Sequence, residues 1–374
     1  MNSNIDSVNT GKPSSSRFMS FERGEISGKS RSSNLELYRI IVMFLIVMHH
    51  YVVNSGLMDV LNAKTFFSLR DYVLLVLGCW GKTGINCFVL ITGYFMCTSH
   101  ITKRKFMKLF LEMYFYDIAI WGIFSLCGYE SISLKSFLKM IFPFFYVQQN
   151  FTVCFLIFYL FIPFLNKLVN TMDEKSHRLL LVLSLFVYTV LPTFAFTKID
   201  FNYVTWFCIL YIVASYIRLY PMKWMSDNRV VGVLMAVSVM LSIGSVVSLG
   251  FITRLLNKGV GNSYHFLSDS NKVLALTTAI FSFLYFRNLK INNSKIINKI
   301  AGSTFGVLMI HANSDTMRQW LWKDICDVTG SYEKMGGGCI LHALCCVLMI
   351  YIACTVIDLL RIWGLEKARK CIRR

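Results

Sequence analysis

Long apolar runs recur along the chain after a polar N-terminal stretch. A membrane-spanning helix needs about 20 mainly apolar residues. The chain has 374 residues, of which 55% are hydrophobic and only 16% are charged, whereas a soluble protein of this length needs a more polar surface. We therefore predict an all-α, polytopic membrane helix bundle of about ten transmembrane helices. The predicted spans are 35–53, 72–97, 107–127, 151–169, 179–196, 203–219, 230–252, 273–286, 296–311 and 338–363.

The positive charges favour one side of this predicted bundle. The net charge is +18, and with the N-terminus inside, about 25 of the 38 Lys and Arg fall in cytoplasmic loops and tails. This asymmetry follows the positive-inside rule and predicts that both ends of the chain lie in the cytoplasm. Because topology accounts for the charge, we expect no nucleic-acid partner.

One long apolar region lies between two polar ends. Residues 1–33 are rich in Ser, Asn and Gly and are predicted to be a disordered cytoplasmic tail. Residues 34–364 form the predicted membrane domain, and residues 365–374 a basic cytoplasmic tail. The twelve cysteines show no paired metal spacing, so we expect neither a metal site nor a disulfide framework. The loops are short, so any chemistry must take place inside the bundle or at its faces.

The first predicted span carries ionisable residues, which are costly in a membrane and need a reason. It reads YRIIVMFLIVMHHYVV, with Arg39 near its start and His49 and His50 near its end. On a helix, Arg39 and His50 point in directions only about 20° apart and lie roughly 16 Å apart along the axis. His49 points about 100° away from His50, while Glu36 lies one turn before Arg39 and can support it. The plainer interpretation is that Arg39 and the histidines mark the two membrane interfaces.

Three other ionisable residues lie in or near predicted spans. His311 can orient the last helices, line a cavity or lie at the outer interface, and we favour a structural role. We expect Asp117 to pair with a lysine or face the cavity. We expect Asp358 to pair with Arg361, three residues further on.

The order of motifs over residues 34–364 resembles that of one family of membrane enzymes. Acyltransferase 3 proteins are integral-membrane acyltransferases, many of which O-acetylate bacterial surface polysaccharides. They often begin their first span with a phrase such as E-L-L-R-I-I-A-M-F…H. This chain reads ELYRIIVMFLIVMHHY, which places the family's histidine at His50. Later matches are GINCFVLITGYF (84–95), LIFYLFIPFLN (156–166), LYIVASYIRLYP (210–221) and STFGVLMIH (303–311).

The chain departs from the family pattern at two places. Many members carry two arginines three apart in the basic run after the second span. Here the run is KRKFMK, and Lys105 and Lys108 meet that spacing, which weakens any bidentate contact. Where the family often has a tryptophan before 156–166, this chain has Asn150 and Phe151.

The resemblance implies a membrane O-acetyltransferase of a bacterial-type plasma (inner) membrane. Its acyl-CoA donor would be acetyl-CoA, and its acceptor a glycan hydroxyl of a capsule, exopolysaccharide or lipopolysaccharide precursor. His50 and Arg39 are the predicted catalytic residues. His50 would act as general base, because imidazole is largely neutral near pH 7. The donor's phosphates would be held by Arg39, Arg104, Lys105 and Lys108. Membrane lipids would surround the bundle, and no metal is expected.

Two other functions remain open from the sequence. A transporter or flippase of lipid-linked glycans would also have many spans, but its charged residues would be spread over several helices. A membrane polysaccharide polymerase would need a larger basic outer loop than this chain offers. The sequence also leaves open whether the acyl group passes through a transient enzyme intermediate.

Overall fold

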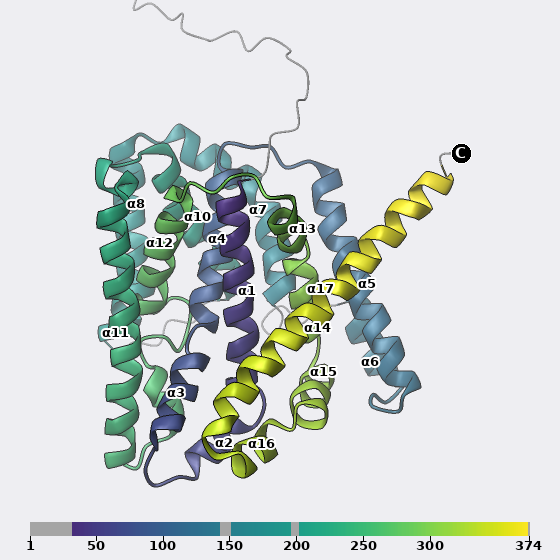
Figure 1. The fold of residues 1–374 in the computed structure, drawn as a ribbon. Coiled ribbons are helices and arrows are strands. Elements are labelled where there is room, and N and C mark those ends of the chain that lie inside the picture. The colour runs from purple at the N-terminus through teal and green to yellow at the C-terminus, as the bar shows by residue number, and fades with distance from the viewer. Residues whose placement is uncertain (1–31, 143–150, 196–201, 373–374) are drawn as a thin grey trace, which may run out of the picture. The chain divides into compact units, whose positions relative to one another are not determined.

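The computed structural model describes residues 32–142, 151–195 and 202–372, which are helical and contain no strand (Figure 1). The predicted all-α class is therefore confirmed. The predicted tail 1–33 falls outside the described residues, apart from the two serines at the start of α1. The main helices are α1 (Ser33–Val53), α2 (Leu57–Asn62), α3 (Leu69–Gly78), α4 (Gly81–Met96), α5 (Lys103–Leu126), α6 (Leu134–Ile141), α7 (Phe151–Thr171), α8 (Glu174–Leu185), α9 (Leu191–Phe194), α10 (Tyr203–Leu219), α11 (Asn228–Leu255), α12 (Val273–Asn288), α13 (Lys295–Ala301), α14 (Thr304–His311), α15 (Asp315–Gln319), α16 (Val328–Lys334) and α17 (Cys339–Ile372).

The described residues contain seven helical segments long and apolar enough to cross a membrane. Two shorter apolar helices, α10 and α12, accompany them. Large apolar side chains remain exposed on α11, such as Val233 and Met240, which suits contact with lipid. The protein is thus a polytopic membrane helix bundle. The seven segments are Ser33–Val53, Leu69–Met96, Lys103–Leu126, Phe151–Thr171, Glu174–Phe194, Asn228–Leu255 and Gly336–Ala368.

Helix α1 occupies the centre of the bundle and packs against α3, α4, α12, α13, α14 and α17 (Figure 1). Its apolar side chains fill the space between these helices; Val47 and Val52 are fully buried. Gly84 of α4 permits a close approach, because a Cβ there would lie 2.7 Å from the Ile46 side chain. The ionisable residues of α1 are therefore held on a helix that is fixed on several sides.

Two predicted spans are broken helices. The span predicted over 72–97 divides at Cys79 into α3 and α4. The span predicted over 296–311 divides at Gly302 and Ser303 into α13 and α14. Glycine is a poor helix former and serine competes for backbone hydrogen bonds, which favours a break there. At the other end of the chain, α17 continues through the predicted basic tail to Ile372.

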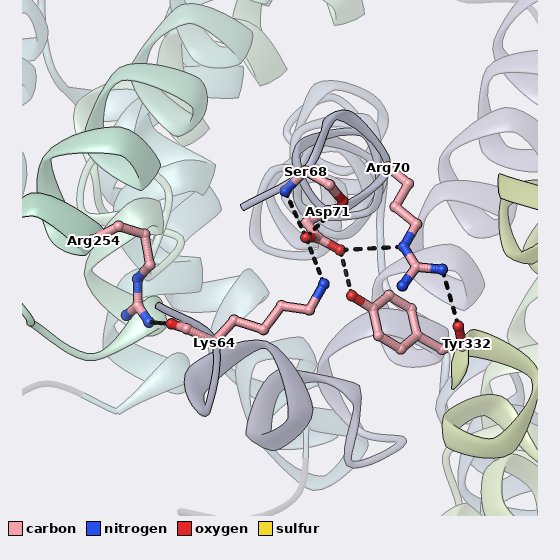
Figure 2. A network of polar contacts seen from close by, with 6 residues as sticks. All are labelled: Lys64, Ser68, Arg70, Asp71, Arg254 and Tyr332. Atoms are coloured by element: carbon pink, nitrogen blue, oxygen red, sulfur yellow. Dashed lines mark hydrogen bonds and ion pairs between the residues drawn. The ribbon is translucent and has the colours of Figure 1, made fainter. Parts of the chain in front are cut away.

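A polar network anchors the start of α3 to α16 (Figure 2). Asp71 is fully buried and accepts hydrogen bonds from Lys64 Nζ at 2.8 Å, from Ser68 and from the Tyr332 hydroxyl. Arg70 donates to the Tyr332 carbonyl at 3.2 Å. Desolvation opposes the charge of Lys64, but its hydrogen bonds to Asp71 and Tyr332 raise its pKa overall. The network ties α16 to the end of the bundle where α1 finishes.

Candidate active site around His50 and His311

His50 lies in the last turn of α1 and contacts a second histidine from a distant part of the chain. His50 Nδ1 is 3.0 Å from His311 Nε2. His311 is the last residue of α14, is fully buried, and also places Nδ1 2.6 Å from the Val307 carbonyl oxygen. The two rings and this carbonyl form a short hydrogen-bonded chain.

The donor and acceptor of each hydrogen bond follow from the carbonyl oxygen at one end of the series. A carbonyl oxygen only accepts, so His311 Nδ1 donates to Val307. In a neutral ring the other nitrogen then carries a lone pair, so His311 Nε2 accepts from His50 Nδ1. His50 Nε2 is left with a free lone pair, and no described residue bonds to it. This tautomer is assigned from the hydrogen-bond geometry.

Helix α14 is held in place by close packing at Gly306. A Cβ at this position would lie only 2.3 Å from Asp358 Oδ1 of α17. Asp358 is in turn fixed by hydrogen bonds from the Tyr116 hydroxyl and from Arg361 Nη2, both at 2.7 Å. The predicted pairing of Asp358 with Arg361 is confirmed. These contacts set the position of the helix that carries His311.

His49 and His50 line a cavity of about 630 Å³. Its wall combines apolar side chains from α1, α4 and α14 with polar ones from α4, α5 and the segment after α14. A mostly preformed cavity with a few convergent polar groups is typical of a ligand or substrate site. The polar side chains used below are His49, His50, Lys82, Asp117, Trp121, Tyr203, Asn313, Asp315 and Arg318.

Most of the charged groups in this wall are paired. Lys82 Nζ donates to the Tyr203 hydroxyl at 2.6 Å and lies 3.7 Å from Asp269 Oδ1. Arg318 pairs with Asp315, three residues before it. Both cations act electrostatically on His50. They line the same cavity as His50.

His49 serves the adjoining helix break. The end of α3 at Gly78 leaves a carbonyl without its next helical donor. His49 Nδ1 lies 2.5 Å from this oxygen and satisfies it. Gly81 leaves room for the ring, since a Cβ there would lie 2.3 Å from His49 Cγ. The two neighbouring histidines thus have different partners, as their different helical directions predicted.

The predicted phosphate-binding residues lie apart from the cavity wall. Arg39 Nη1 contacts Glu36 Oε1 at 3.2 Å, so the predicted support of Arg39 by Glu36 is confirmed. Arg104, Lys105 and Lys108 are exposed in the first turns of α5. None of these four cations belongs to the described lining of the cavity. The structure therefore does not bring Arg39 and the basic run together with His50 in one cavity.

The structure places Asp117 and His311, whose roles the sequence left open, at or beside the cavity. Asp117 faces the cavity, one of its two predicted placements, and accepts a hydrogen bond from Asn313 Nδ2 at 2.9 Å. A structural role was favoured for His311, but its ring is hydrogen-bonded to His50. Asn313, Lys82 and Trp121 were missed altogether. For Asn313 the available signal was the phrase STFGVLMIHAN, in which the amide follows the histidine that ends a short helix.

The fold is a membrane helix bundle, and a histidine pair lies beside its cavity. These features indicate an integral membrane protein with a buried reaction or binding site. The family model described as an acyltransferase domain, that of the acyltransferase 3 family, matches residues 32–359. The chain belongs to this family, and it is a membrane acyltransferase. No curated protein and no solved structure matches the chain.

Proposed function

We propose that this protein is an O-acetyltransferase of the bacterial plasma membrane. It moves the acetyl group of acetyl-CoA to a hydroxyl of a surface polysaccharide or of its lipid-linked precursor. The observation that carries this proposal is the hydrogen bond between His50 Nδ1 and His311 Nε2 beside a substrate-sized cavity, which leaves His50 Nε2 available to accept a proton. A positioned neutral imidazole is the commonest general base for activating a hydroxyl.

His311 supports the base in the proposed reaction. Its Nε2 accepts from His50 Nδ1 and so favours the tautomer whose Nε2 is unprotonated. When His50 takes a proton, the same hydrogen bond remains and helps to spread the positive charge. An orienting partner of this kind has the role that the carboxylate has in a Ser-His-Asp triad, here filled by a neutral ring.

The proposed transfer proceeds in two steps, addition and elimination. His50 Nε2 removes the hydroxyl proton while the oxygen attacks the thioester carbonyl, which gives a tetrahedral oxyanion. The carbon–sulfur bond then breaks, the ester is released, and the coenzyme A thiolate takes the proton from His50 Nε2. Lys82 and Arg318 are the cations of the cavity wall and would stabilise the developing oxyanion.

The donor's phosphates would be held by Arg39, Arg104, Lys105 and Lys108 near the starts of α1 and α5. Arg39 is part of the catalytic arrangement in this proposal because it places the donor, roughly 16 Å from His50 along α1. An extended pantetheine arm is of that order in length. Since the cavity wall does not include Arg39 and Ile46 packs closely against Gly84, α1 and α4 would have to separate there for the arm to reach His50.

The proposal is tested with the full-length protein reconstituted in lipid vesicles. Radiolabelled acetyl-CoA is supplied together with surface polysaccharide from a strain that lacks the gene, and labelled ester on the glycan is measured. We expect labelled, base-labile ester with the protein and none without it. Polysaccharide from the parent and deletion strains should differ in mass by acetyl groups. Equal acetylation of the two polysaccharides, with no label transferred in vitro, would exclude the proposed activity.

A further inference from the structure

A second polar group in the cavity lies beside the histidine pair and has no part in the proton transfer. Asp117 and Trp121 are one helical turn apart on α5 and both line the cavity. Asn313 joins them from the segment after α14, with its Nδ2 2.9 Å from Asp117 Oδ1. Asn313 follows His311 by two residues, so this group adjoins the ring that orients His50.

Asp117 and Asn313 keep hydrogen-bonding capacity that the described protein does not use. Asp117 makes no ion pair with a described residue, and its second carboxylate oxygen has no hydrogen bond there. The Asn313 carbonyl oxygen is also without a hydrogen bond in the described ranges. An Asp carboxylate accepts hydrogen bonds, and an Asn amide both donates and accepts them. Together they can bind two neighbouring hydroxyl groups, such as those on a sugar ring.

Trp121 adds an independent observation. Its indole Nε1 is buried and has no hydrogen-bond partner in the described part of the chain. Among the buried polar atoms without a partner there, it is the one that belongs to a residue of the cavity wall. This nitrogen has almost no accessible surface, so Trp121 lines the cavity with the carbon atoms of its ring, which offer an apolar surface to a sugar.

We propose that Asp117, Asn313 and Trp121 form the acceptor subsite, which binds the sugar ring next to the hydroxyl that is acetylated. This inference rests on the proposed function. Asp117 and Asn313 bind ring hydroxyls, and Trp121 packs its indole ring against the sugar. Together they present the reacting hydroxyl to His50 Nε2. The subsite determines which sugar is acetylated and takes no part in holding acetyl-CoA.

The experiment measures binding and transfer separately with the full-length protein in lipid vesicles. The probe is a set of oligosaccharides cut from surface polysaccharide of the deletion strain. Equilibrium binding is measured without acetyl-CoA, and the KM of each substrate is measured in the transfer assay. The variants are Asp117→Asn, which keeps the shape but removes the charge, and Trp121→Phe, which keeps an aromatic ring but reduces its surface.

Asp117→Asn should weaken oligosaccharide binding about tenfold, as expected for a hydrogen bond to a charged group, and Trp121→Phe about threefold, because the smaller ring loses part of its contact with the sugar. The KM for the oligosaccharide should rise in parallel, and the KM for acetyl-CoA should stay the same. Trp322→Phe is the matched control. Trp322 is fully buried and its Nε1 also lacks a partner in the described ranges, but it does not line the cavity.

The outcomes separate the two proposals. If wild-type protein does not bind the oligosaccharides, or if both variants bind them as tightly as wild type, the subsite is wrong. An increase in the KM for acetyl-CoA alone would also overturn it. If the oligosaccharides bind and the variants weaken that binding, but no acetyl group is transferred, the subsite stands and the proposed activity fails.

Discussion

Helix α5 contributes to two polar clusters, of which one is closed by ion pairs with α17 (the α17 cluster) and the other faces the cavity. Its Glu112 and Tyr116 face α17, where Arg361 contacts Glu112 Oε1 and Asp358 Oδ1 at 2.7 Å each. The exposed fractions of these three charged side chains are 8% or less, and none of them lines the cavity. Its Asp117 and Trp121 line the cavity beside the histidine pair, and Asp117 makes one hydrogen bond there, from Asn313, and no ion pair with a described residue.

The difference separates groups that serve the fold from groups that serve a ligand. Buried charges are tolerated when they are paired and hydrogen-bonded, and removing one partner leaves the others costly. Polar groups that remain unsatisfied next to a cavity are paired only when something enters it. We therefore expect changes in the α17 cluster to lower stability and changes at the cavity to lower activity.

The largest effect on stability is expected from Arg361→Leu. Two carboxylates would lose their cation within an apolar environment, so the free energy of unfolding should fall by about 3–5 kcal/mol. Thermal unfolding of the purified protein in detergent measures the change. Arg229→Leu is the control, because Arg229 is exposed at the start of α11 and its loss should cost about 0.5 kcal/mol or less. Similar losses in both variants would show that the α17 cluster does not hold the fold together.

The next largest effect is on activity and concerns the orientation of His50. His311→Leu should lower kcat about 100-fold, or roughly 2.7 kcal/mol in the barrier, because nothing would accept from His50 Nδ1. His311→Gln should recover part of this loss, since its amide oxygen can accept the same hydrogen bond. Unfolding temperature is measured alongside kcat. If leucine and glutamine give the same kcat, the orienting role of His311 is wrong.

The smallest effect links the two clusters through Gly306. In Gly306→Ala the added Cβ would meet Asp358, which Tyr116 and Arg361 hold in place, so the unfolding free energy should fall by about 1–3 kcal/mol. The displacement of α14 should also lower kcat. Gly244→Ala is the control, because nothing lies within 4 Å of a Cβ there. Equal stability of the two alanine variants would mean that α14 adjusts freely.

The periodicity of α1 was enough to predict some features of the site. It separated His49 from His50 and paired Glu36 with Arg39, because both relations depend only on residues of one helix. The contact between His50 and His311 joins residues 261 apart in the chain, and no local pattern reports such a contact. The same holds for Asp117 with Asn313. The helix breaks could be suspected from Gly78 and Gly302, but apolar runs hid them.

The distance between Arg39 and His50 was predicted from helix geometry, whereas the path between them depends on how neighbouring helices pack. Close packing at Gly84 and Ile46 lies on that path. The role of Arg39 and of the basic run in holding acetyl-CoA therefore stays a prediction. The affinity of the Arg39→Ala variant for acetyl-CoA, measured separately from acyl transfer, tests the role of Arg39.

The role of His50 as the base is tested most directly with purified His50→Ala protein. The measurement is the transfer of labelled acetyl from acetyl-CoA to the polysaccharide. His100→Ala is compared in parallel, because His100 is exposed in the loop before α5. We predict that His50→Ala inserts, folds and melts like wild type but transfers acetyl at least about 1,000-fold more slowly. His100→Ala should be fully active. Ester formation by His50→Ala at the wild-type rate would contradict the assignment of His50 as the base.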